Sequence, residues 1–186
     1  MADIDSIGLV ELSSVSRGFV VQDAMLKAAT VTILMARTIC SGKFLIAVAG
    51  DVASVTAAVE AGTHSGFGFM IERRIISGIH PSIFPAIGGG VDIDAGKMKG
   101  LGVIETFSAS SIVEVAYAAV KAANVTLFRI HLAMALGGKG FVLMTGDVAS
   151  LEAAVAAGCA VARRDGILVD RAIIPSPSKE IYREFL

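Results

Sequence analysis

Short runs of apolar residues along the first half of the chain predict strands, and between them the apolar spacing changes to that of helices. Strands are expected at about residues 7–12, 31–39 and 44–49 and near residues 70–76. A helix is expected from about 17 to 29, and a second one after Asp51, which is a suitable N-cap. The order strand, helix, strand, strand, helix, strand is the ferredoxin-like βαββαβ arrangement.

The second predicted helix should bury one apolar face. Its members share helical spacing and are Val52, Val55, Ala58, Val59 and Gly62. Between the second and third strands stands the turn Cys40-Ser41-Gly42-Lys43, whose glycine favours a hairpin-like connection.

The second half of the chain repeats the first. Ile7-Gly8-Leu9-Val10-Glu11 returns as Leu101-Gly102-Val103-Ile104-Glu105, and Gly50-Asp51-Val52-Ala53-Ser54 returns as Gly146-Asp147-Val148-Ala149-Ser150. The second copy is longer by two residues between Thr126 and Gly138. We therefore expect an α+β fold of two tandem ferredoxin-like domains, at 1–90 and 101–186, with a glycine-rich linker at 91–100. An assembly of such chains can imitate a ring with twice as many subunits.

Composition favours an assembly with large interfaces. Hydrophobic residues make up 54% of the chain and charged residues 18%, against roughly 45–50% and 25% in ordinary soluble domains. No apolar run reaches the length that spans a membrane, and the acidic start Met-Ala-Asp-Ile-Asp lacks the features of a secretion signal. We expect a cytoplasmic protein. A net charge of −1 without a basic cluster argues against nucleic-acid binding.

Several features that resemble enzyme motifs do not form a catalytic set. Gly42-Lys43 and Gly138-Lys139 lack the remaining residues of a phosphate loop. The three histidines, His64, His80 and His131, are far apart and show no metal-ligand spacing. Glu11 and Glu105 occupy equivalent strand positions, which favours a shared structural role over acid and base catalysis. We expect no enzymatic activity.

Several segments together carry a family resemblance. They are the strand Ile-Gly-Leu-Val-Glu, the segment Asp23-Ala24-Met25-Leu26-Lys27-Ala28-Ala29, the second-copy segment Lys121-Ala122-Ala123-Asn124-Val125-Thr126 and both Gly-Asp-Val segments. In this order they resemble the shell-protein domain of bacterial microcompartments. The resemblance covers almost the whole chain, and two unpermuted copies resemble the trimeric, pseudohexameric class of tandem shell proteins. It implies a homotrimeric tile that packs with other microcompartment shell proteins in the shell around metabolic enzymes. It also implies that Lys27 and Lys121 lie at the tile edge, although the arginine that usually lies beside such a lysine is missing from both copies.

The same resemblance places the turn between the second and third strands around a central pore. Its predicted lining residues are Thr38, Ile39, Cys40, Ser41 and Gly42 in the first copy and Ala135, Leu136, Gly137 and Gly138 in the second. The first turn is similar to that of tandem shell proteins from propanediol-utilisation compartments, in which the equivalent cysteine holds an iron–sulfur cluster at the trimer centre.

Cys40 is accordingly the expected metal ligand. A four-iron cluster normally takes four thiolates, and three chains bring three Cys40 thiolates to one threefold axis, which leaves one iron for an outside ligand. The predicted cofactor is one [4Fe-4S] cluster per trimer. We expect it to transfer electrons across the shell, with encapsulated redox enzymes as candidate partners, and to catalyse no reaction of its own. Cys159 stands at a non-equivalent position, where a core role is expected.

Two alternatives stay open on the sequence. The same tile could have an open pore that admits small metabolites, with Cys40 as a thiol without metal. The chain could instead be an enzyme or regulator of ferredoxin-like fold with a ligand between the repeats.

Overall fold

The computed structural model describes residues 4–89, 91, 93, 94 and 98–183. These form two compact units that divide between Ile79 and His80. Each unit holds one of the two repeats.

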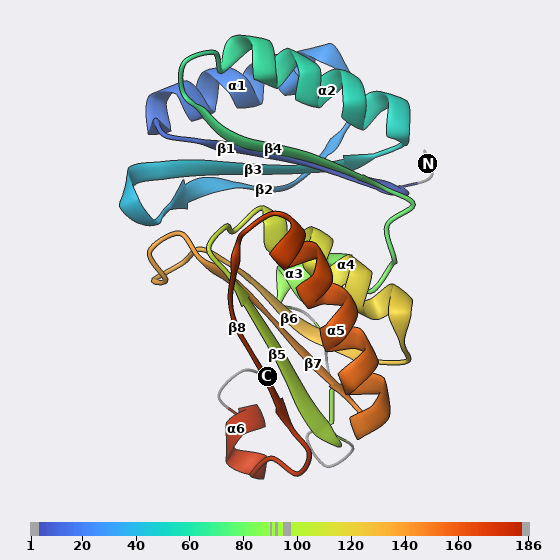
Figure 1. Ribbon diagram of the computed structural model, residues 1–186. Helices are drawn as coiled ribbons and strands as arrows, with labels where there is room; N and C mark the ends of the chain where they lie inside the picture. The colour runs from blue at the N-terminus through green and yellow to red at the C-terminus, as the bar shows by residue number, and fades with distance from the viewer. Residues whose placement is uncertain (1–3, 90, 92, 95–97, 184–186) are drawn as a thin grey trace. The chain divides into compact units, whose positions relative to one another are not determined.

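The first unit has four strands and two helices. Its elements are β1 (Ser6–Leu12), α1 (Val15–Ala28), β2 (Thr32–Ile39), the 3-10 turn Cys40–Gly42, β3 (Lys43–Gly50), α2 (Val52–Ser65) and β4 (Met70–Ser77). The strands form one sheet in the order β2-β3-β1-β4, in which every pairing is antiparallel. Both helices cover the same face of this sheet (Figure 1).

The second unit repeats this arrangement and adds two short helices. Its elements are α3 (Ile83–Gly88), β5 (Gly100–Thr106), α4 (Ser111–Ala122), β6 (Thr126–Leu132), β7 (Gly140–Gly146), α5 (Val148–Arg164), β8 (Leu168–Ile174) and α6 (Lys179–Arg183). The strand order β6-β7-β5-β8 matches that of the first sheet. The predicted tandem ferredoxin-like α+β fold is confirmed.

Equivalent aspartates begin the second helix of each repeat, as predicted. Asp51 accepts a hydrogen bond from the Ser54 amide at 2.9 Å, and Asp147 accepts one from the Ser150 amide at 2.8 Å. These backbone hydrogen bonds, followed by those from the two serine hydroxyls, lower the pKa of both carboxyls below the usual 3.8. Because the bonds satisfy amides that the helix leaves open, they fix where α2 and α5 start.

The helices bury narrower faces than the apolar pattern indicates. In α2, Val55, Ala58, Val59 and Gly62 are buried as expected, but Val52 is 43% exposed. Its counterpart Val148 in α5 is similarly exposed. Each of these valines is the first residue of its helix.

One core contact is built differently in the two repeats. Gly18 on α1 lies so close to Phe44 on β3 that a Cβ added to it would stand 2.3 Å from the ring. At the equivalent places the second repeat has Ile112 on α4 and Gly140 on β7, and a Cβ on Gly140 would meet Ile112 at 2.8 Å. Large and small residues have therefore exchanged sides of the same helix–strand contact.

A short helix precedes the predicted linker, in the segment expected to end the first domain. Residues 83–88 form α3, which packs on β6 and α4 of the second unit, so the first unit ends at Ile79 and not at the predicted residue 90. Apolar periodicity did not indicate this helix, because it is short and contains Pro85. Residues 90, 92 and 95–97 of the predicted linker lie outside the described residues, and Gly100 already belongs to β5.

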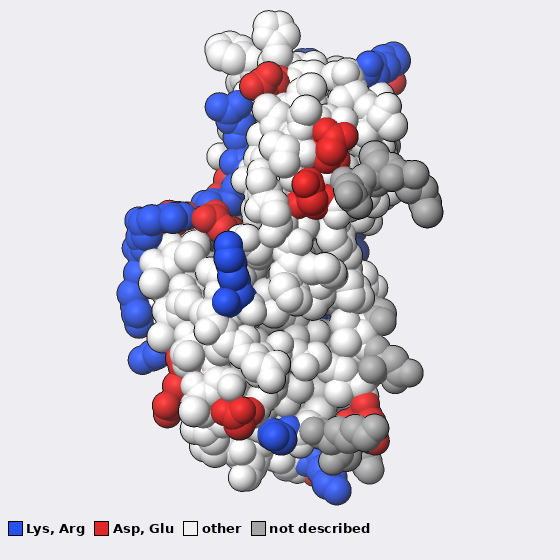
Figure 2. Space-filling view, turned by 90° about the vertical axis from the view of Figure 1, so that its right-hand side faces the viewer, with Lys and Arg blue, Asp and Glu red and all other residues white. Residues whose placement is uncertain are grey.

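Uncharged residues cover most of the face shown in Figure 2. Lys and Arg side chains lie mainly along one edge of this face, with Asp and Glu side chains nearby. Among the described helices, none combines the length and the apolar character needed to cross a bilayer.

Candidate functional site

Cys40 lies at the tip of the hairpin between β2 and β3. The last pair of the ladder joins Ile39 to Lys43, so Cys40 is the first residue beyond the paired strands. The next two residues take left-handed backbone conformations, with φ of 66° at Ser41 and 71° at Gly42. This tight reversal leaves Cys40 half-buried, while Ser41 and Gly42 are exposed.

An ion pair fixes the base of this hairpin, and both repeats have it. Lys43 Nζ lies 2.9 Å from Glu11 Oε1, and Lys139 Nζ lies 2.9 Å from Glu105 Oε1. The Glu11 side chain is only 2% exposed, whereas the Glu105 side chain is 31% exposed. The predicted structural role of the two glutamates is confirmed, and the two lysines bind carboxylates of the protein itself.

The equivalent turn of the second repeat is longer and carries no thiol. It runs from Ala133 to Lys139 and is closed by a hydrogen bond from the Ala133 amide to the Lys139 carbonyl at 3.1 Å. Four of its residues have positive φ: Ala133, Ala135, Gly137 and Gly138. Ala135 and Gly137 are exposed, Leu136 is half-buried and Gly138 is buried. Left-handed alanines are costly, so neighbouring contacts must hold this turn in place.

His131 provides one such contact. Its Nε2 donates a hydrogen bond to the Met134 carbonyl oxygen at 2.8 Å, and its ring stacks on Phe141 at a centroid distance of 4.8 Å. His131 therefore supports the turn. His80 likewise has a local partner, because its Nδ1 lies 2.8 Å from the Ser82 hydroxyl.

The predicted pore residues form two separate groups, one at each turn. Thr38, Ile39, Cys40, Ser41 and Gly42 lie together at the first turn, where Thr38 is exposed and Ile39 is buried. Within the part of the chain that the structure describes, no three His, Cys, Asp or Glu side chains lie close enough together to hold a metal ion. A metal centre at Cys40 would therefore need ligands from more than one chain.

Cys159 is a core residue, as predicted. It is fully buried on α5, and burial raises the pKa of its thiol. A thiol that stays protonated is a poor nucleophile and a poor metal ligand.

The two lysines predicted for the tile edge occupy equivalent places but have different partners. Lys27 lies in the last turn of α1 and pairs with Asp23 at 2.6 Å. Lys121 lies in the last turn of α4, where its Nζ donates to the Tyr117 hydroxyl at 3.1 Å and stands 5.2 Å from the centre of that ring. Both lysines are exposed. Their role in contacts between tiles stays a prediction.

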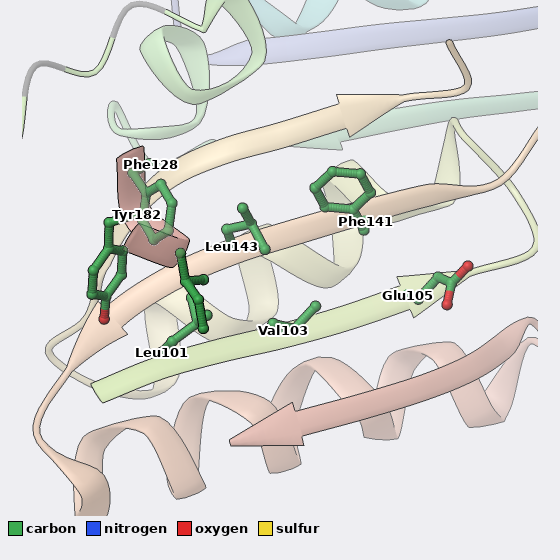
Figure 3. Close-up of a pocket in the computed structure, with 8 residues that line it drawn as sticks. Leu101, Val103, Glu105, Phe128, Phe141, Leu143 and Tyr182 are labelled. Carbon is green, nitrogen blue, oxygen red and sulfur yellow. The ribbon is translucent and has the colours of Figure 1, made fainter. Parts of the chain in front are cut away.

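An apolar hollow that sequence analysis did not predict lies on the second sheet, on the face opposite α4 and α5 (Figure 3). The hollow has a volume of about 320 Å³. Figure 3 shows that strands β5, β6 and β7 form its floor and that Tyr182 of α6 stands at one end beside Phe128. The lining is apolar apart from Glu105, which Lys139 neutralises.

These features define a protein of two equivalent ferredoxin-like domains, whose hairpin turns and helix ends carry the candidate functional residues. The BMC domain model matches residues 6–79 and 100–177. The chain thus belongs to the BMC domain family, the shell proteins of bacterial microcompartments, and the predicted resemblance is confirmed.

Individual relatives agree with this assignment. The bacterial microcompartment shell protein PduT of Citrobacter freundii is 39% identical over 97% of both chains. The shell protein EutM of Salmonella typhimurium is 39% identical over 47% of this chain and 90% of its own length, which corresponds to one domain. A crystal structure of a microcompartments protein from Desulfitobacterium hafniense, 43% identical, superposes with a TM-score of 0.91 and covers 97% of this chain and 99% of the other. PduT and EutM are shell proteins by name, which disfavours the alternative of an enzyme or regulator.

Proposed function

We propose that three copies of this chain form a trimeric shell tile and that their Cys40 thiolates hold one [4Fe-4S] cluster at the central axis. Two equivalent domains per chain give a trimer six similar units, which can close a ring around one axis. The full-length similarity to the shell protein PduT supports this architecture.

The observation that carries the cluster proposal is the place of Cys40. It stands at the tip of a tight hairpin, half-buried, and the equivalent turn of the second repeat has no cysteine. A ring of three chains would therefore present three thiols at the axis, and not six.

Three thiolates suit the cluster by number and by symmetry. A cubane has threefold axes, each of which passes through one iron and the opposite sulfide, so three Cys40 thiolates can bind three irons. The fourth iron would take a ligand from outside the chain. When bound, such a cluster supplies one-electron redox chemistry.

The neighbouring residues leave room for this group. Apart from Gly42 itself and its two chain neighbours, no heavy atom lies within 4 Å of the place where a Cβ on Gly42 would stand, and Ser41 beside it is exposed. The Lys43–Glu11 pair anchors the first residue of β3 behind the turn. Cys40 would thus be held in place by the hairpin, next to the exposed Ser41 and Gly42. Electron transfer across the shell, with encapsulated redox enzymes as partners and other shell proteins as neighbours, is the role that we assign to this site.

A second candidate function is passage of small metabolites through the same axis without a metal. It is favoured by the small and exposed residues of both turns, Ser41, Gly42, Ala135 and Gly137. In this case Cys40 would line the passage as an ordinary thiol.

The test is the content of iron and acid-labile sulfide in protein purified without oxygen, together with its mass by sedimentation. The cluster proposal predicts about four iron and four sulfide per trimer. Cys40→Ser should lose the iron and keep the trimer, while Cys159→Ala, the matched control, should keep both. An intact wild-type trimer with almost no iron would refute the cluster and leave metabolite passage. A protein that stays monomeric at every concentration would refute the tile itself.

A further inference from the structure

The helix α3 joins one repeat to the next. It follows β4 of the first unit in the chain, yet it packs on β6 and α4 of the second unit. Its residues Ile83 and Ala86 are fully buried. The segment that leaves the fourth strand of one repeat is thus seated on the second strand and first helix of the repeat that follows.

The helix α6 is the counterpart of α3 in the second repeat. Ile76 on β4 pairs with Ile7 on β1, and Ile174 on β8 pairs with Leu101, the repeat counterpart of Ile7. Carrying this register onward aligns Ile83-Phe84 of α3 with Ile181-Tyr182 of α6. A short helix with an isoleucine followed by an aromatic residue therefore comes after the fourth strand of each repeat.

In a single chain, α6 has only part of the burial that α3 has. The Tyr182 side chain is 2% exposed, its hydroxyl donates to the Lys99 carbonyl at 2.9 Å, and its ring meets Phe128 edge-on at 6.0 Å. The neighbouring Ile181 is 37% exposed and borders the hollow on the second sheet. Its counterpart Ile83 is fully buried. Tyr182 thus holds α6 to its own domain (Figure 3), while Ile181 presents an apolar surface.

The first repeat has exposed apolar side chains on α1, the helix equivalent to α4. Phe19 on α1 is 62% exposed, whereas its counterpart Val113 on α4 is fully buried. Val20 beside it is 50% exposed. The edge strands also match in shape, because β2 and β6 have the same irregularity, between Ile33 and Met35 in one and between Leu127 and Arg129 in the other. The first repeat can therefore receive a helix in the way that the second repeat does.

We infer that α6 docks on β2 and α1 of a second copy of this chain, in the way that α3 docks on β6 and α4 within the chain. The inference rests on the proposed ring of three chains and names the contact that links them. Because the two surfaces are different, the contact is head-to-tail, and such contacts close into rings when the rotation between copies permits. Ile181 of one copy then covers apolar surface of the next.

The test places a photoreactive benzophenone amino acid at position 181 of the full chain. Copies of normal and heavy isotopic composition are mixed, so that cross-links between chains can be distinguished from those within one chain. We expect cross-links between chains that map to β2 and α1. The same group at position 52, which is 43% exposed on α2, serves as the control and should give none to these elements.

Substitutions measure the strength of the contact. Ile181→Asp should raise the dissociation constant of the trimer at least about tenfold, the effect of losing one well-packed interface residue. Tyr182→Phe keeps the ring and loses only the hydrogen bond within its own domain, so the dissociation constant should stay within about twofold.

The outcomes separate this inference from the proposed function. A wild-type trimer whose position 181 cross-links only within its own chain, or to other elements, refutes the docking and leaves the tile standing. An unchanged dissociation constant for Ile181→Asp also refutes the docking. A wild-type chain that is monomeric refutes both.

Discussion

The exchange of large and small residues between the repeats allows a quantitative test of how each core is packed. The pair of residues found in the second repeat is placed in the first repeat by the single variants Gly18→Ile and Phe44→Gly and by the double variant. A Cβ at Gly18 would stand 2.3 Å from Phe44 Cγ, so Gly18→Ile alone overpacks the contact and should cost about 2–3 kcal/mol.

The opposite single change opens a cavity. Phe44 is 2% exposed and also contacts the Phe19 ring at 5.1 Å, so Phe44→Gly should cost about 4 kcal/mol. If the two effects were independent, the double variant would lose about 6–7 kcal/mol. Because the isoleucine can fill the space that the phenylalanine leaves, as Ile112 does beside Gly140, we expect a loss of about 4 kcal/mol and a coupling free energy of about 2–3 kcal/mol.

The assay is urea unfolding followed by far-ultraviolet circular dichroism, with all four proteins at one fixed concentration because assembly adds to apparent stability. The reciprocal set, Ile112→Gly, Gly140→Phe and their combination, is the matched control and should show coupling of the same sign. If the losses in free energy of unfolding simply add in the first-repeat double variant, residues 18 and 44 do not compete for the same space and this account of the core is wrong.

Three further predictions follow from the ion pairs, the thiols and the helix caps. Lys43→Met should lower the free energy of unfolding by on the order of 3 kcal/mol, because it removes the counter-ion of the buried Glu11 carboxylate. Lys139→Met, beside the more exposed Glu105, should lower it by less than about 1 kcal/mol. Equal losses for the two variants in urea titrations would contradict this prediction. In cluster-free native protein, iodoacetamide should label Cys40 and spare Cys159, whose burial raises the pKa of its thiol, until the chain unfolds; equal labelling rates by mass spectrometry would disprove the difference. Hydrogen bonds from Ser54 lower the pKa of Asp51 below 3.8, so the stabilisation by this carboxylate is complete above that pH and is lost as the pH falls through the lowered pKa. The difference in Tm between wild type and Asp51→Ala should therefore be constant above about pH 5 and shrink below about pH 4. A difference that grows in acid would contradict this sign.

The internal repeat made most of this fold predictable. Each strand appears within a residue or two of its expected place, and Asp51 and Asp147 mark helix starts because an aspartate before an apolar periodic run has a direct local reason to cap. The hairpin around Cys40 was likewise signalled by local residues, since Gly42 occupies a left-handed position. What depends on neighbouring residues in the chain could be predicted.

Features that depend on tertiary contacts could not. The helix α3 contains a proline and is only six residues long, so its formation depends on the surface of β6 and α4. The Lys43–Glu11 pair joins residues on different strands, and apolar periodicity carries no information about it. Alignment of the two copies shows that Gly18 corresponds to the larger Ile112. It does not show that Phe44 and Gly140 contact these positions, which is what makes the difference a packing exchange.

The unequal turns of the two repeats bear on how a duplicated gene can acquire chemistry. In a ring of six identical single domains, any residue placed at the axis is present six times, and no position can change without changing all the others. Two fused copies remove this restriction, because the turn at Cys40 can carry a thiol while the turn at residues 133–139 lengthens and stays without one. In the trimer that we propose, fusion would lower the symmetry of the assembly from sixfold to threefold, and would make it possible to select a donor set of three.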